Sequence, residues 1–63
     1  MRKVLINARN AKAMTQHDLA KHIGITNTMI SAIERGCRDP SLKVAQALSA
    51  YFNLPIEELL ATD

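Results

Sequence analysis

Two histidines and one cysteine are the residues of this chain with the chemistry to bind a metal or to attack a substrate. His17 and His22 stand five positions apart, which separates them by about 140° around a helix, whereas two ligands on one helical face are three or four positions apart. Cys37 is the only cysteine, and it completes no tetrahedral metal site with them. No nucleophile has a base at a plausible spacing, so we expect no catalysis, no metal and no cofactor.

Short polar side chains between residues 26 and 35 have a different chemistry, because they can hydrogen-bond to DNA bases. If Ile30 and Ile33 face inward on a helix, the outward residues are Asn27, Thr28, Ser31, Ala32 and Arg35. An asparagine amide can form two hydrogen bonds with the edge of adenine, and the methyl groups of threonine and alanine can pack on that of thymine. Together with Thr26, these residues are candidates for contacts with DNA at an A·T-rich half-site. On an arbitrary helix they would form a solvated face, so the neighbouring elements decide between the two interpretations.

Five helices are predicted from the apolar spacing and from the residues that interrupt it. Apolar residues recur every three or four positions and not every two, which is the helical period. The expected helices lie at residues 3–12, 16–23, 27–35, 42–52 and 56–60. The residues expected to face the core include Leu5, Ala8, Leu19, Ala20, Ile23, Ile30, Ile33, Leu42, Ala45, Leu48, Ser49 and Phe52.

The ends of these helices carry recognisable capping residues. Hydroxyl side chains that can accept from the first free amides of a helix precede three of them, at Thr15, Thr26 and Ser41. Asp18 follows Thr15 by three positions, as in a reciprocal capping box. The residues expected to end helices in the left-handed conformation are Gly24, Gly36 and Asn53.

The second and third helices are joined by only about three residues around Gly24. This connection is too short for a hairpin with a long loop and suits two helices that cross steeply. Such a crossing needs a small residue where the helices approach, and Ala20 supplies it. It also needs a residue that tolerates positive φ in the turn, and Gly24 supplies that. The crossing behind the polar residues favours the DNA-reading interpretation over the solvated face.

With these residues in place, the sequence resembles the helix-turn-helix family of phage Cro and CI repressors, also called the xenobiotic-response-element family. The likeness covers nearly the whole chain, and its most specific parts are Thr15-Gln16, Leu19-Ala20, Gly24, Ile33-Glu34-Arg35-Gly36 and Pro40-Ser41. The resemblance implies an all-α, five-helix domain of the lambda-repressor type over residues 1–63. It places the helix-turn-helix at about residues 16–35 and the recognition helix, residues 27–35, in the DNA major groove.

Phosphate contacts follow partly from the resemblance, which places Gln16 on the DNA backbone. The amides at the start of that helix also form a partly positive end that suits a phosphate. Arg35 and Arg38 flank the groove side of the next loop, and we expect both to contact DNA.

The resemblance also pairs Arg9 with Glu34, a pair that we expect to be mainly structural. The sequence departs from the family at two positions where glycine is common, Ala13 and Asn53. Asparagine is an acceptable substitute at a left-handed position, whereas alanine disfavours a left-handed turn.

Size and charge also indicate a small binding module. The chain has 63 residues, 48% hydrophobic and 22% charged, which predicts one globular domain with little room for a deep cleft. Residues 1–55 hold all eight basic residues and three acidic ones, a net charge of +5, whereas residues 56–63 hold three acidic residues, a net charge of −3. A basic body favours a polyanionic partner, and we expect the acidic end to lie away from it. No apolar run approaches the ~18 residues of a membrane span, so we expect a cytoplasmic protein. The resemblance implies that it is bacterial or phage-encoded and associated with the nucleoid.

A homodimer on a palindromic operator is expected, because one helix-turn-helix unit buries too little surface for tight specific binding. The expected dimer surface is formed by Tyr51, Leu54, Ile56, Leu59 and Leu60. We expect one of the two leucines, Leu59 or Leu60, to close the core of the monomer instead.

The sequence therefore predicts a sequence-specific regulator of transcription that binds double-stranded DNA, a repressor of the phage or mobile-element type, and not an enzyme. The alternative is an antitoxin that binds a toxin protein and its own promoter, since such antitoxins can use this fold. Only three residues follow the fifth expected helix, so we expect little chain to wrap around a toxin. No small-molecule effector is expected.

Overall fold

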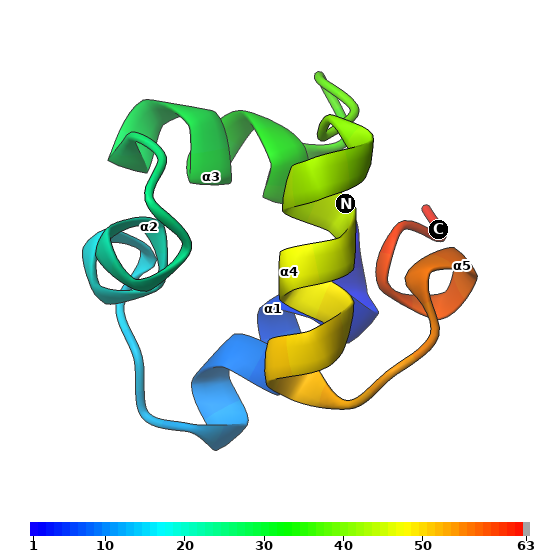
Figure 1. Ribbon diagram of the computed structural model, residues 1–63, viewed down its shortest axis with the longest axis horizontal. Coiled ribbons are helices and arrows are strands. Elements are labelled where there is room, and N and C mark those ends of the chain that lie inside the picture. The colour runs from blue at the N-terminus through cyan, green and yellow to red at the C-terminus, as the bar shows by residue number, and fades with distance from the viewer. Residues whose placement is uncertain (63) are drawn as a thin grey trace.

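A computed structural model describes residues 1–62 of the chain, and in that range it contains five α-helices and no strand (Figure 1). The predicted all-α, five-helix fold is confirmed. The helices are α1 (Lys3–Ala11), α2 (Gln16–Ile23), α3 (Asn27–Arg35), α4 (Leu42–Phe52) and α5 (Ile56–Leu59). Three of the expected ranges match to the residue, and α1 and α5 each end one residue early. Asp63, which was counted with the acidic end, lies outside the described residues.

The predicted N-caps are confirmed by their hydrogen bonds. The hydroxyl oxygens of Thr15, Thr26 and Ser41 each accept from the backbone amide three residues later, at 3.0, 3.1 and 3.2 Å. The Thr15 amide donates in turn to the carboxylate of Asp18 at 3.0 Å, which completes the capping box. This backbone hydrogen bond, with a smaller effect of the Thr15 hydroxyl, lowers the pKa of the Asp18 carboxyl group. Each cap is worth about 1 kcal/mol to its helix.

The predicted left-handed C-caps are confirmed as well. Gly24, Gly36 and Asn53 have φ angles of 89°, 79° and 55°. A Cβ atom added at Gly24 would meet nothing within 4 Å. Glycine is therefore favoured at that position by the backbone angle and not by the space around it.

Ala13 also adopts a left-handed conformation, with φ of 55°, although alanine disfavours it. Three hydrogen bonds hold the turn. The Ala13 amide donates to the carbonyl of Asn10 at 2.9 Å, the Met14 amide donates to the carbonyl of Arg9 at 3.3 Å, and the Arg9 guanidinium donates to the carbonyl of Met14 at 2.7 Å. The tertiary position of Arg9 thus overrides the local preference of alanine.

Ala13→Gly is accordingly expected to stabilise the protein. Left-handed backbone costs an L-residue about 1–2 kcal/mol, and the greater freedom of glycine in the unfolded chain offsets part of the relief, leaving a gain of about 0.5–1 kcal/mol. Urea unfolding followed by circular dichroism measures this gain. The same substitution at Ala50, which is exposed inside α4, is the control and should destabilise by about 0.5–1 kcal/mol. Equal effects at both positions would contradict the strain at Ala13.

The core lies where all five helices meet, and its fully buried large residues are Leu5, Leu19, Ile30, Ile33, Leu48 and Leu59. Ala8, Ile23, Ser49 and Phe52 are half-buried at its edge. The core prediction was wrong for Leu42, which is 71% exposed. Leu42 is the first residue of α4, and the buried residues of this helix, Ala45 and Leu48, lie further along it.

The residue before α1 lies beside the residue that follows α5 (Figure 1). The guanidinium of Arg2, a residue that no sequence pattern singles out, donates to the carbonyl of Leu60 at 3.0 Å. None of the helices formed by residues 1–62 has the length and apolar content needed to cross a bilayer.

Candidate nucleic-acid interface

The helix pair α2 and α3 forms the expected steep crossing. Figure 1 shows α2 end-on beside the first turn of α3, which runs along one edge of the molecule. These two helices contact each other more extensively than any other pair. Ala20 is 2% exposed in this helix pair, and Gly24 turns the chain between them. One long side of α3 is thereby packed, and the other is left at the surface.

The surface side of α3 carries four polar residues. Asn27, Thr28 and Arg35 are exposed and Ser31 is half-exposed, and at ~100° per residue they share an arc of about 100° of the helix. Within residues 1–62, the side chains of Asn27 and Thr28 make no hydrogen bond to the protein. Their amide and hydroxyl groups are therefore available to an outside partner.

Ala32 does not belong to this surface, and its expected outward position was wrong. Its exposure is 8%, and together with Ile30, Ile33 and Glu34 it forms the buried side of α3. These four residues span about 200° of the helix, because α2 packs on one flank of α3 and α1 on another. Burial on two flanks widens the inner face beyond the narrow stripe that the spacing of Ile30 and Ile33 indicated.

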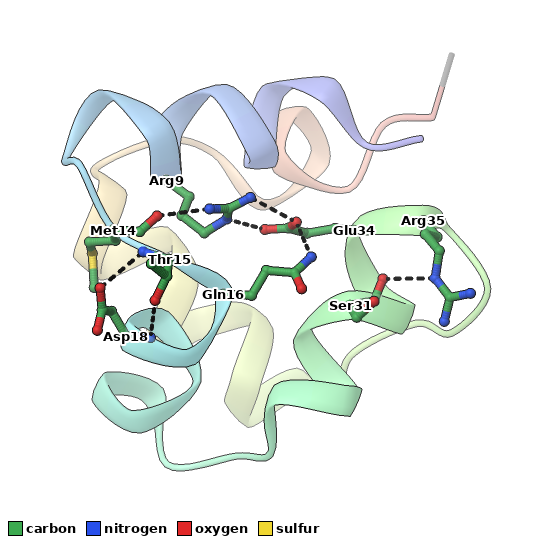
Figure 2. Close-up of polar contacts among 8 residues, drawn as sticks. All are labelled: Arg9, Met14, Thr15, Gln16, Asp18, Ser31, Glu34 and Arg35. Atoms are coloured by element: carbon green, nitrogen blue, oxygen red, sulfur yellow. Dashed lines mark hydrogen bonds and ion pairs between the residues drawn. The ribbon is translucent and has the colours of Figure 1, made fainter.

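The side chains of Thr26 and Gln16 each form one hydrogen bond within the protein and keep a second hydrogen-bonding group free. The Thr26 oxygen accepts from the Met29 amide, so its hydroxyl hydrogen remains free to donate. The side-chain amide of Gln16 donates to a carboxylate oxygen of Glu34 at 2.9 Å (Figure 2). Since this amide carries two hydrogens, one remains for a phosphate.

A buried ion pair between Arg9 and Glu34 holds α2 and α3 in position. The guanidinium of Arg9 donates to both carboxylate oxygens of Glu34, at 2.7 and 3.3 Å, and to the carbonyl of Met14 at 2.7 Å (Figure 2). The side chains of Arg9 and Glu34 are 13% and 2% exposed. This confirms the expected pair, and it places the pair inside the fold, where it joins α1, the start of α2 and the end of α3.

The loop after α3 presents positive charge at the surface. Arg35 and Arg38 are exposed, and the Arg35 guanidinium donates to the carbonyl of Ser31 at 3.3 Å (Figure 2). Of the segment that was expected to lie away from DNA, Thr62 lies next to this loop. A Cβ atom at Gly36 would lie 3.2 Å from the methyl of Thr62, so residues 61–62 run beside the loop and not on the opposite side of the molecule.

The residues expected to form a dimer surface differ in burial. Leu59 is 1% exposed and is the leucine that closes the monomer core, so its place in a dimer surface was wrong. Leu54, Ile56 and Leu60 are half-buried. The Tyr51 ring already packs against other side chains of the chain. Its centroid lies 4.0 Å from that of the His22 ring and 4.9 Å from the Lys12 ammonium.

Comparisons with known proteins give a consistent family. Residues 5–59 match the family model described as helix-turn-helix. An uncharacterised HTH-type transcriptional regulator of Methanocaldococcus jannaschii is 46% identical over 73% of this chain and 70% of its own length. Another from Archaeoglobus fulgidus is 36% identical over all of this chain and 90% of its own length. The HTH-type transcriptional activator BcrR of Enterococcus faecalis is 34% identical over 84% of this chain, which spans only 26% of that protein.

No solved structure matches the chain at a significant level. The family match covers most of the chain and agrees with the residues that carried the resemblance. The chain belongs to the helix-turn-helix family of DNA-binding transcription regulators.

Proposed function

We propose that this protein regulates transcription by binding a palindromic operator in double-stranded DNA as a homodimer, with α3 in the major groove. The observation that carries the proposal is the uncovered polar side of α3. The start of α2 and the basic loop both lie near the end of this helix, because Gln16 bonds to Glu34 and the loop follows Arg35 directly. A recognition helix needs this combination of readable side chains and neighbouring phosphate contacts.

The first turn of α3 supplies the base contacts in this proposal, because the start of a recognition helix reaches deepest into the groove. Asn27 and Thr28 are exposed there without a partner within the described residues, and Thr26 retains a hydroxyl donor. Ser31 lies one turn further along the same side. Short side chains of this kind require the helix backbone to approach the base edges closely. An asparagine amide matches adenine and a threonine methyl packs on that of thymine, so these residues favour A·T pairs.

Phosphate contacts come from the start of α2 and from the end of α3 with the loop that follows it. Gln16 and the first amides of α2 bind one phosphate, since an amide-rich helix start attracts anions. Arg35 and Arg38 bind further phosphates, because both guanidinium groups are exposed. These contacts set the orientation of the domain without reading sequence.

Dimerisation through Leu54, Ile56 and Leu60 completes the proposal. These apolar residues are only half-buried within the chain, and a second copy would cover them. Two subunits then present their α3 helices about 34 Å apart, one turn of DNA. We propose that the protein acts in the cytoplasm as a repressor. In this proposal, the dimer on its operator competes with RNA polymerase for the same DNA.

Selection of binding sites from random DNA duplexes tests the proposed function. The expected result is an enriched palindrome with half-sites about 10 base pairs apart. Its affinity should fall with salt by a slope of about −0.9 for each phosphate neutralised. Enrichment of no sequence, or affinity that does not depend on salt, would contradict the proposal.

Arg38→Ala is expected to weaken binding to the selected duplex and to a scrambled duplex by the same factor. The side chain meets a phosphate and not a base in this proposal, and a dimer loses two such contacts, so the salt slope should become shallower by about 2. Fluorescence anisotropy at several salt concentrations measures both quantities. Lys12→Ala removes the same charge from the exposed residue that follows α1, and the end of α1 lies at the opposite edge of the molecule from α3 (Figure 1), so this variant is the control. A slope altered equally by both variants would mean that only net charge matters.

A further inference from the structure

Arg2 is one of two buried charged residues among the described residues 1–62, with an exposure of 4%. Glu34, the other, is already accounted for by its pair with Arg9. Arg2 has no comparable explanation in the helical pattern, because it precedes α1 and its side chain bonds to residues between 31 and 58 positions away. A buried guanidinium has a large desolvation cost unless its donors are satisfied, so its partners indicate what it does.

The side chain of Arg2 bonds to carbonyls of three separate segments. It donates to Ile33 in the last turns of α3 at 2.9 Å, to Arg38 in the following loop at 2.8 Å, and to Leu60 after α5 at 3.0 Å. The carbonyl of Ile33 is one of the last four of α3; it accepts a hydrogen bond from the Gly36 amide at 3.1 Å as well as the one from Arg2. The planar fork of an arginine suits such divided bonding, since it offers five donors in fixed directions.

The loop at residues 36–41 is therefore held from its inner side. Arg2 fixes the carbonyl of Arg38, while the side chain of Arg38 is exposed at the surface. Arg2 also forms an ion pair with the next loop residue, Asp39, whose side chain is 87% exposed. A carboxylate at this place would repel DNA phosphates, and the positive charge of Arg2 directly behind it reduces that repulsion.

We propose that Arg2 is a positioning residue for DNA binding: it holds the loop at residues 36–41 so that Arg38 meets a phosphate, and it offsets the charge of Asp39. The proposal rests on the proposed function. Arg2 itself touches no DNA and acts through Arg38. Its third bond, to Leu60, connects the same guanidinium to the end of α5.

A double-mutant cycle between Arg2→Lys and Arg38→Ala tests the proposal. Lysine keeps the charge, but its single ammonium cannot reach three carbonyls in different directions. Arg2→Lys alone should weaken binding to the selected and scrambled duplexes alike by about tenfold, and it should make the salt slope shallower as Arg38→Ala does. In a protein that already carries Arg38→Ala, adding Arg2→Lys should change affinity by less than about twofold, because the contact it positions is gone.

The outcomes separate this proposal from the proposed function. If Arg38→Ala weakens binding but Arg2→Lys leaves affinity and salt slope unchanged, the positioning role is overturned and the proposed function stands. The role is equally overturned if Arg2→Lys weakens binding as much with Arg38→Ala present as without it, since its effect then does not pass through Arg38. If Arg38→Ala itself has no effect, the loop contacts no phosphate and the positioning role is overturned, while the proposed function is decided by the selection of binding sites.

Loss of Arg2 also weakens the fold, so the cycle is best measured with Ala13→Gly present in every variant. That substitution adds stability in a turn at the opposite edge of the molecule from α3. Cys37, which is exposed in the same loop and is the only cysteine, takes a nitroxide label for a second measurement without DNA. Arg2→Lys should increase the mobility of this label while the helical circular dichroism stays unchanged. An unchanged mobility would overturn the proposal.

Discussion

Replacing Glu34 with alanine is expected to lower the free energy of unfolding by about 3–5 kcal/mol. A domain of 63 residues has about 3–9 kcal/mol in total, so much of the protein would be unfolded at room temperature. The carboxylate accepts two hydrogen bonds from Arg9 and one from Gln16. Without it, Arg9, whose side chain is only 13% exposed in the native protein, has no counter-charge, which is the costly result of removing one partner. Urea unfolding followed by circular dichroism measures the loss.

Two further variants show whether this cost comes from the buried charge. Glu57→Ala removes an exposed carboxylate on α5 and should change stability by no more than about 0.5 kcal/mol. Arg9→Met combined with Glu34→Leu removes both charges and fills the space with apolar atoms, so it should recover most of the loss. A double variant as unstable as Glu34→Ala alone would show that shape, and not the unpaired charge, dominates.

Replacing Asn27 with alanine is expected to weaken binding to the selected operator by about 10–100-fold while leaving binding to scrambled DNA unchanged. The reason is that a bidentate contact with a base edge is worth about 1–3 kcal/mol of discrimination, whereas non-specific binding depends on phosphates. Asn27 makes a clean test, because it is exposed and its side chain holds no cap or other bond within the described residues. Thr26 is less suitable, since its loss would also remove the cap of α3.

Repeating the site selection with Asn27→Ala locates the contact. The base preference should relax at one position in each half-site and stay intact elsewhere. Gln46→Ala, an exposed amide on α4, is the matched control and should leave every position unchanged. An unaltered preference with Asn27→Ala would mean that a different side of α3 faces the bases.

The helix ends were predictable from sequence because caps are local. Thr15, Ser41 and Gly24 act on amides and backbone angles within a few residues of themselves, so three or four letters of sequence are enough to place them. The crossing of α2 and α3 followed from the same local signals, since a short connection with a glycine leaves few arrangements. For this reason the surface positions of Asn27, Thr28, Ser31 and Arg35 on α3 could be predicted from sequence.

The remaining features depend on contacts between distant parts of the chain. Arg2 is buried by partners up to 58 positions away, which no periodic pattern reveals. Ala32 is buried because α3 packs against both α1 and α2. Leu42 is exposed because it lies at the start of α4, before the buried residues of that helix. Ala13 accepts an unfavourable angle because Arg9 holds the next carbonyl. In each case tertiary packing outweighs a local preference.

The central claim, that the side of α3 bearing Asn27 and Thr28 meets DNA, is tested most directly by backbone amide shifts in nuclear magnetic resonance. The labelled protein is titrated with the selected duplex, and a dilution series without DNA separates dimerisation from binding. The largest shifts on adding DNA are expected at residues 26–31, at Gln16 and at residues 35–38. Shifts centred on α1 and α5, with residues 26–31 unchanged, would contradict the claim.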